Sequence, residues 1–251
     1  MEKQDIKSMT QEELRAFLVS LGEKPFRTAQ IYQWMHEKLA SSFDDMTNLS
    51  KVLRQKLQDA CEYVSLEKVR VQISQIDGTR KYLFRLADGN VIESVLMRYK
   101  HGNSVCISSQ VGCRMGCRFC ASTLDGLERN LRPSEMLDQI YQIQRDTGER
   151  VSNVVVMGSG EPLDNYDNLI RFIHLLTEEG GLHISQRNVT VSTCGLVPKI
   201  RELADQGLTI TLALSLHAPN DEVRKSLMPI ARTYALKDVL AACHYYFEKT
   251  G

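Results

Sequence analysis

Three cysteines near the middle of the chain have a spacing that suits metal binding. Cys113, Cys117 and Cys120 are separated by three residues and then by two, and Cys106 precedes them. Closely spaced thiols bind zinc, hold an iron–sulfur cluster or act in redox reactions. A structural zinc ion normally takes four protein ligands, whereas a cluster held by three thiolates keeps one iron open for another molecule. The residues therefore favour an iron–sulfur cluster and leave zinc and a redox CxxC as alternatives.

Three further segments of unusual composition each follow a predicted strand. They are "GSGEP" at 158–162, "STCG" at 192–195 and "SLHAP" at 215–219, and the cysteines follow another strand. In barrels and open sheets of parallel strands, the functional site lies at the C-terminal ends of the strands. We therefore expect these loops and the cysteine loop to meet in one site.

Hydrophobic patterns predict the elements that position these loops. Strands are predicted at 104–109, 153–158, 188–193 and 208–217, and helices at 134–147, 166–179, 197–207, 221–228 and 236–251. Each of the four strands is followed by a helix. Successive βα units predict parallel strands, in a barrel or in a doubly wound sheet.

The preceding part of the chain has a different pattern. Helical patterns fill most of residues 1–60, with a capping box at Thr10 and Glu13 and another helix start at Ser50. Alternating runs at 69–75, 80–86 and 90–97 are separated by turn residues and predict an antiparallel meander. We therefore expect an α/β protein with a small N-terminal helical domain plus meander at 1–97 and a βα core at 98–251.

Composition limits the class of protein. The chain has 251 residues, 43% of them hydrophobic, and 31 basic residues balance 31 acidic ones. It has no apolar run long enough for a membrane span, and its polar N-terminus lacks the pattern of a signal peptide. We therefore expect a cytoplasmic protein without a membrane partner, in which clustered cysteines serve metal or redox chemistry. Zero net charge argues against a strongly basic nucleic-acid binder, although basic residues outnumber acidic ones between Arg98 and Arg132.

The cysteine motif and several longer stretches resemble a known family. C-x3-C-x2-C with the aromatic Phe119 before the last cysteine is similar to the signature of the radical S-adenosylmethionine superfamily. "KPFRTAQIYQWMHEK", "SSQVGCRMGCRFCAST", "VVVMGSGEPLDNYDN", "VTVSTCGLVPKI" and "ALSLHAPNDEVRKSLMPI" together resemble the RlmN-type adenine-C2 RNA methyltransferases. The resemblance implies a partial (β/α) barrel of the radical SAM type, with a 4Fe-4S cluster and S-adenosyl-L-methionine as cofactors.

The resemblance also implies roles for individual residues. The cluster ligands would be Cys113, Cys117 and Cys120. The S-adenosylmethionine pocket would be formed by Gly160, Glu161, Ser192, Ser215, Leu216 and His217, with Glu161 binding the ammonium group. Glu93 would be the proton acceptor. Cys106 would resolve a protein–RNA adduct by forming a transient disulfide. We interpret the remaining cysteines as structural, namely Cys61, Cys194 and Cys243.

The implied substrate is adenosine in 23S rRNA and in tRNA, methylated at C2 through a methyl-cysteine intermediate. Two alternatives remain, which are C8 methylation by a Cfr-type enzyme and a non-catalytic, zinc-stapled RNA-binding module; Pro162 favours the C2 group over the C8 group. A flavodoxin-like electron donor and a monomeric state are also expected. RNA contacts are expected from the N-terminal domain and from the basic segment near the cysteine loop, with Tyr99, Lys100 and Arg118 as candidates within that segment.

The resemblance further implies a longer protein. Family members continue beyond the region that matches this chain, and that part carries the methyl-carrying cysteine. Cys243, in the last predicted helix, has none of the surroundings expected of that cysteine. We therefore expect a C-terminally truncated chain that assembles the cluster but does not complete turnover.

Overall fold

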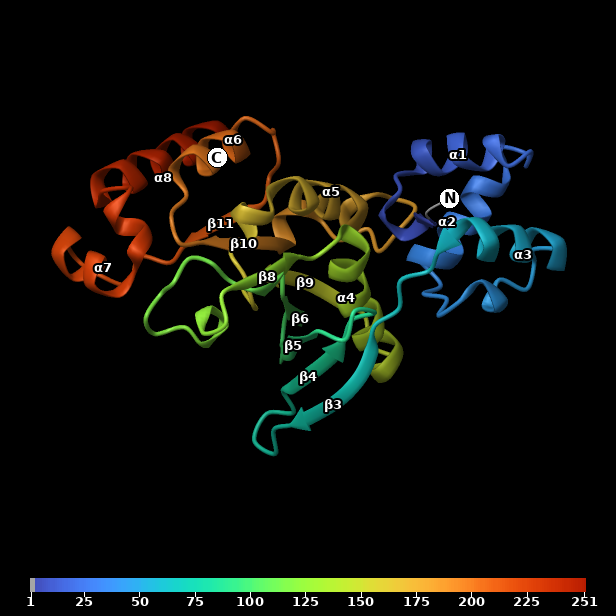
Figure 1. The fold of residues 1–251 in the computed structure, drawn as a ribbon, viewed down its shortest axis with the longest axis horizontal. Coiled ribbons are helices and arrows are strands. Elements are labelled where there is room, and N and C mark those ends of the chain that lie inside the picture. Colours follow the sequence, from blue (N-terminus) through green and yellow to red (C-terminus); the bar gives the residue numbers. More distant parts are fainter. Residues whose placement is uncertain (1–2) are drawn as a thin grey trace.

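A seven-stranded sheet in the order β11-β10-β9-β6-β5-β4-β3 runs through the protein (Figure 1). The computed structural model describes residues 3–251. The parallel strands are β6 (Gly102–Ile107), β9 (Val151–Val156), β10 (Val189–Thr193) and β11 (Thr211–Leu214). The antiparallel strands are β3 (Glu67–Ile73), β4 (Arg80–Arg85) and β5 (Val91–Tyr99).

A helix follows each parallel strand, which confirms the predicted βα units. The helices are α4 (Pro133–Thr147), α5 (Tyr166–Thr177), α6 (Val197–Ala204) and α7 (Asp221–Leu227), and the chain ends with α8 (Leu236–Thr250). The strand predicted at 208–217 is shorter in the structure. Its four residues pair with Thr190–Thr193 of β10, and the ladder ends at the last residue of β10, where Thr193 lies opposite Leu214.

The antiparallel meander is continuous with the parallel strands. β5 pairs with β6, and Val95 lies opposite Cys106. The expected boundary between residues 97 and 98 therefore falls within β5, and the division into two domains stays a prediction. The turn between β5 and β6 reverses the chain, and a Cβ on Gly102 would lie 2.8 Å from the Ser152 hydroxyl oxygen.

The two faces of the parallel part of the sheet differ in burial. On one face the valine and isoleucine side chains have essentially no exposed surface, among them Val105, Ile107, Val154, Val156, Val189 and Val191. These side chains belong to one core with residues of α4, α5 and α6. Alternate residues of a strand point to opposite faces. The residues between these therefore lie on the other face, where most side chains keep partial exposure.

The N-terminal part is a group of short helices beside α4 and α5 (Figure 1). Its elements are β1 (Gln4–Asp5), η1 (Ile6–Ser8), α1 (Gln11–Ser20), α2 (Arg27–His36), η2 (Phe43–Asp45), α3 (Lys51–Ala60) and β2 (Cys61–Glu62). The predicted capping box is present, because Thr10 and Glu13 each accept the other's backbone N–H. The Ser50 hydroxyl caps α3 as predicted.

A buried ion pair attaches this N-terminal group to the core. The Lys7 ammonium lies 2.9 Å from the Asp138 carboxylate, and neither side chain is exposed. Lys7 also lies over the Tyr63 ring. Burial of an ion pair is favourable only with good geometry and further hydrogen bonds. Asp138 meets this condition because it also accepts the Leu66 N–H at 2.7 Å.

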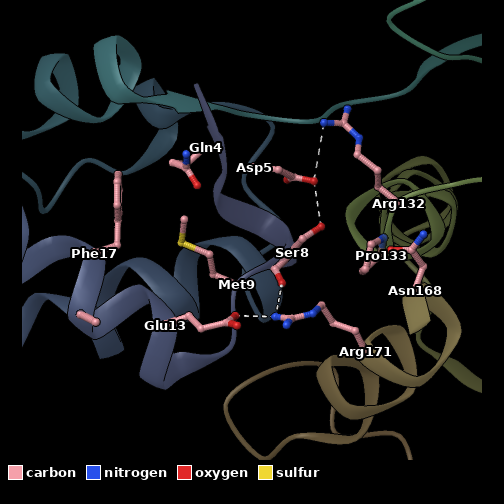
Figure 2. A pocket seen from close by; sticks show the side chains of 11 residues that line it. Gln4, Asp5, Ser8, Met9, Glu13, Phe17, Arg132, Pro133, Asn168 and Arg171 are labelled. Atoms are coloured by element: carbon pink, nitrogen blue, oxygen red, sulfur yellow. Dashed lines mark hydrogen bonds and ion pairs between the residues drawn. The ribbon is translucent and has the colours of Figure 1, made fainter. Parts of the chain in front are cut away.

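A cavity of about 620 Å³ opens between this group and the first turns of α4 and α5 (Figure 2). Its two arginines face acidic partners, Arg171 with Glu13 and Arg132 with Asp5. None of the predicted site residues lines it. Within the described residues, none of the helices has both the length and the apolar character of a membrane span.

Candidate active site

The cysteine loop is closed at its base by two short antiparallel strands. β7 (Gln110–Gly112) pairs with β8 (Leu127–Asn130), and η3 (Ala121–Thr123) lies in the loop between them. The Cys113 N–H donates to the Gly126 carbonyl oxygen at 2.8 Å. Gly112 has φ +74°, and a Cβ there would lie 2.0 Å from that same oxygen. Only glycine fits where the two backbone segments approach each other this closely. The contact fixes the position at which the loop begins with Cys113.

The three thiols of the loop are free and largely shielded. Cys113 and Cys117 are 7% and 8% exposed, and Cys120 is half-buried. Burial raises the pKa of the Cys113 thiol, and burial together with the neighbouring thiols raises that of Cys117 to about 11. A bound metal would displace these protons, because the thiolate is the ligand form. The donor set therefore suits a cluster of irons.

No group of three His, Cys, Asp or Glu side chains in the part of the chain that the structure describes is arranged around one point as for a single metal ion. A cube of four irons does not require that arrangement, since each thiolate binds a separate corner. The loop lies next to the other predicted loops. Cys117 belongs to a small buried cluster with Cys194 and Met228.

The segment containing Gly160 and Glu161 forms hydrogen bonds with the end of β6 and with β7, the two strands that precede the cysteine loop. Gly158 N–H donates to the Ile107 carbonyl oxygen at 2.9 Å, and Glu161 N–H donates to the Gln110 side chain at 2.8 Å. Gly160 has φ +106°, and a Cβ there would lie 2.8 Å from the Gln110 backbone nitrogen. The glycines thus allow a close approach that a side chain would prevent.

Glu161 is a buried carboxylate at this edge of the sheet. It is 4% exposed, and burial raises its pKa. Two backbone N–H groups oppose that shift, from Cys194 at 2.7 Å and from Leu163 at 3.2 Å. Hydrogen bonds to the ionised form favour that form and orient the carboxylate. A buried, oriented carboxylate beside free thiols is suited to binding an ammonium group.

Four predicted site residues lie on one face of the sheet. Cys106 lies opposite Val95, and Glu93 precedes Val95 by two residues on β5, so both side chains are on the same face. Cys106 also pairs with Val155, which pairs with Thr190, so Ser192 shares the face. Ser215 follows β11 on this face and continues the ladder to Thr193. This is the face opposite the one buried by helices.

The last predicted loop meets the cysteine loop. His217 is exposed and has φ +57°, an unusual conformation for a residue other than glycine. Its ring lies 4.4 Å from the Phe119 ring, centroid to centroid. Leu216 N–H donates back to the Leu214 carbonyl oxygen at 3.0 Å. The structure therefore brings the cysteine loop, the Glu161 segment and the Ser215–His217 segment to one edge of the sheet.

Two residues expected near the cysteine loop lie at the other end of β6. Tyr99 pairs with Gly102 at the start of β6, whereas the cysteine loop follows the end of that strand. Lys100 is in the same turn. Proximity in sequence was misleading because the β5–β6 turn reverses the chain. Arg118 is exposed within the cysteine loop.

Sequence reasoning missed several residues that organise the site. Gln110 has no exposed surface and donates to both Asn130 and Asp164 at 2.8 and 3.0 Å. Asp164 in turn pairs with Arg114 of the cysteine loop. Cys194, interpreted as structural, packs against Cys117. The sequence offered one signal for them, which is position: Gln110 directly follows the predicted strand 104–109, and Cys194 lies within the predicted site segment 192–195.

Comparison with known proteins finds two matching family models and several similar proteins. Residues 4–63 match the family model of the ribosomal RNA large subunit methyltransferase N-terminal domain, and residues 107–250 match that of the radical SAM superfamily. A "probable dual-specificity RNA methyltransferase RlmN" of Lachnospira eligens is 70% identical over 98% of this chain and 71% of its own length. That of Clostridium novyi is 53% identical over 98% of this chain and 72% of its own.

A solved structure supports the same assignment. The crystal structure of a radical SAM methyltransferase from Sphaerobacter thermophilus superimposes with a TM-score of 0.94 at 42% identity, over 99% of this chain and 74% of that chain. The predicted radical SAM fold is confirmed by this match and by the family model. The chain belongs to the RlmN family of radical SAM RNA methyltransferases.

Proposed function

We propose that the protein methylates C2 of adenosine in 23S rRNA and tRNA through a methyl-cysteine intermediate, using a 4Fe-4S cluster and S-adenosylmethionine. Membership of the family supports RNA methylation by radical SAM chemistry. The observation that carries the site assignment is the meeting of three free thiols with the buried Glu161 carboxylate at one sheet edge. The core at 98–251 would hold the cofactors, and residues 1–97 would contribute to RNA binding.

The positions of the candidate residues support their cofactor-binding roles. Cys113, Cys117 and Cys120 would hold the cluster, and Glu161 would bind the ammonium group of S-adenosylmethionine beside Gly160. Ser192, Ser215, Leu216 and His217 would complete that pocket. When bound, the cluster and S-adenosylmethionine supply the one-electron chemistry and the methyl group. Hydrogen bonds made by the Gly158 N–H, the Gln110 side chain and the Cys194 N–H hold the Glu161 segment that would orient S-adenosylmethionine.

The proposed catalytic roles of Glu93 and Cys106 are supported by their position on the same open face of the sheet. Glu93 would take the proton from adenine C2, since its carboxylate is half-exposed and faces the open side of the sheet. The Lys81 ammonium lies 2.6 Å from this carboxylate and forms an ion pair with it. Cys106, as a thiolate, would resolve the protein–RNA adduct by attacking the sulfur of the methyl-carrying cysteine. The disulfide would form as the bond from that sulfur to the RNA-linked carbon breaks, and the electron pair of that bond would leave with the carbon. Burial raises the pKa of Cys106, so it would remain a thiol until that step.

RNA would approach the open face and the exposed loop beside the thiols. An adenine in folded RNA must leave its stack before its C2 can react. Phe119, 53% exposed, offers a surface for stacking, and Arg118 offers a contact for phosphate. We expect a monomer and a flavodoxin-like electron donor.

Anaerobic reconstitution tests the cofactor assignment first. We expect about four irons per chain, with matching sulfide and release of 5′-deoxyadenosine on reduction with S-adenosylmethionine. Cys113→Ala should lose the iron, whereas the matched control Cys243→Ala, in α8, should keep it. Zinc in place of iron would instead support the RNA-binding module.

The methylated position requires a second experiment. A chimera would join this chain to the part of the Lachnospira eligens relative beyond the matched region. Mass analysis of nucleosides from 23S rRNA and tRNA after reaction should show 2-methyladenosine. Appearance of 8-methyladenosine would overturn the C2 proposal in favour of the C8 alternative.

A further inference from the structure

A fully buried arginine lies behind the candidate S-adenosylmethionine site. Arg224 of α7 has no exposed surface, and its Nη2 donates to the Cys194 carbonyl oxygen at 2.6 Å. Its Nε and Nη1 have no hydrogen-bond partner among residues 3–251. A buried cation with unpaired donors is costly for folding. Stability alone therefore gives no reason for an arginine at this position.

The hydrogen bond from Arg224 leads to Glu161 in two steps. The arginine holds the carbonyl group of Cys194, and the N–H of the same residue donates to Glu161 Oε2 at 2.7 Å. Gly195 completes the turn with φ +102°, and a Cβ there would lie 3.1 Å from Arg224 Nη2. The guanidinium thus lies against the 194–195 turn, and a larger residue at Gly195 would displace it.

The same helix also contacts the cysteine loop. The Arg118 N–H donates to the Leu227 carbonyl oxygen at 2.9 Å, just after Arg224 on α7. Met228 is 1% exposed and packs with Cys117 and Cys194. The segment from Arg224 to Met228 therefore connects two of the loops that form the site.

We propose that Arg224 is a positioning residue, which holds the 194–195 turn and through it orients the Glu161 carboxylate for S-adenosylmethionine. This inference rests on the proposed role of Glu161 in that site. Arg224 itself would not touch the ligand. It acts through the Cys194 backbone, which places one N–H group at the carboxylate.

Arg224→Met tests the proposal, because methionine fills much of the same volume without a charge. We expect the Cys194 amide to exchange with deuterium about tenfold faster, as loss of a hydrogen bond to a charged group implies. The affinity of the cluster-loaded chain for S-adenosylmethionine should fall about tenfold as well. The unfolding midpoint should stay unchanged or rise, since a buried, incompletely paired cation is removed. Arg224→Lys retains a donor and should restore part of the protection.

Lys225→Met is the matched control, since Lys225 is exposed on the same helix and the change in charge is identical. It should alter neither the amide exchange nor the affinity. Unchanged exchange at Cys194 in Arg224→Met would overturn the proposal, as would a fall in the unfolding midpoint that accounts for the other changes. If the parent chain loaded with cluster does not bind S-adenosylmethionine, the proposed function fails, and the exchange measurement still decides whether Arg224 holds the turn.

Discussion

The Phe119 ring packs against the His217 ring at a centroid distance of 4.4 Å and an interplanar angle of 51°. One ring belongs to the loop after the first parallel strand, and the other to the loop after the last. The contact therefore joins the two ends of the parallel part of the sheet. Because Phe119 lies between Cys117 and Cys120 in sequence, the contact also joins the cysteine loop to the Ser215–His217 segment.

Replacing Phe119 should expose the cluster more than it affects the fold. We expect Phe119→Ala to change the free energy of unfolding by less than about 0.5 kcal/mol, because half of the side chain is already exposed. The reconstituted cluster should lose its visible absorbance several-fold faster in air. Phe26→Ala, at a similarly exposed phenylalanine in the N-terminal part, should bleach at the parent rate. Equal bleaching of both variants would show that Phe119 gives no protection.

Gly160 should be intolerant of any side chain. Gly160→Ala combines a positive φ with a Cβ 2.8 Å from the Gln110 backbone nitrogen. Left-handed strain and overpacking together should cost about 2–5 kcal/mol of unfolding free energy, measured by urea titration. Gly89→Ala is a matched control, since Gly89 has φ +90° with nothing near its Cβ direction. It should cost only about 1–2 kcal/mol. A similar loss in both variants would mean that crowding against Gln110 is unimportant.

Replacing Glu93 should lower methylation activity strongly and the free energy of unfolding only slightly. Its ion pair with Lys81 is between half-exposed side chains, so Glu93→Gln should cost less than about 1 kcal/mol of unfolding free energy. In the chimera, methylation should fall by about 100-fold or more, as expected for loss of a general base. Iron content should not change. Glu67→Gln, which removes an exposed carboxylate paired with Arg85 on the same meander, should retain full activity. Full activity in Glu93→Gln would assign the proton transfer to another group.

Local sequence patterns predicted the individual helices and strands. The joining of the strands into one sheet depends on strand register and on turns. Thr10 and Ser50 were recognised because a cap needs only a few neighbouring residues. The joining of the meander to the parallel strands was missed, because the pairing of Val95 with Cys106 depends on a turn whose geometry the pattern does not give. Tyr99 was expected beside the thiols because it is near them in sequence. The turn between β5 and β6 places it instead at the other end of β6.

The site was predicted from motifs, and its supporting contacts were not. The meeting of the cysteine loop with Glu161 followed from the rule that strand ends converge. Gln110 and Arg224 were missed because their importance depends on hydrogen bonds between segments distant in sequence. A polar residue in a sequence carries no sign that it is buried, and both of these side chains have no exposed surface.

His36 should make the stability of the protein depend on pH. Its ring nitrogen Nδ1 lies 2.6 Å from the Tyr141 hydroxyl, and both side chains are buried. Burial, together with the nearby Lys7 ammonium, lowers the pKa of His36 from 6.5 to about 3. Between these values the unfolded chain binds a proton that the folded protein does not bind. Stability should therefore fall as the pH drops through this interval, by about 1.4 kcal/mol per pH unit from this residue.

Urea unfolding at about pH 7 and about pH 5 measures this effect. His36→Gln retains a polar partner for Tyr141 and cannot titrate, so its loss of stability over the interval should be smaller than that of the parent. The exposed His183 provides the control, and His183→Gln should keep the parent's pH dependence. If the parent and His36→Gln lose the same stability, then His36 is already charged or is not buried in solution. A carboxylate such as Asp88, whose pKa the hydrogen bond from Arg129 lowers from 3.8 to about 2, loses its stabilising effect only between these two values and so would not contribute between pH 7 and pH 5.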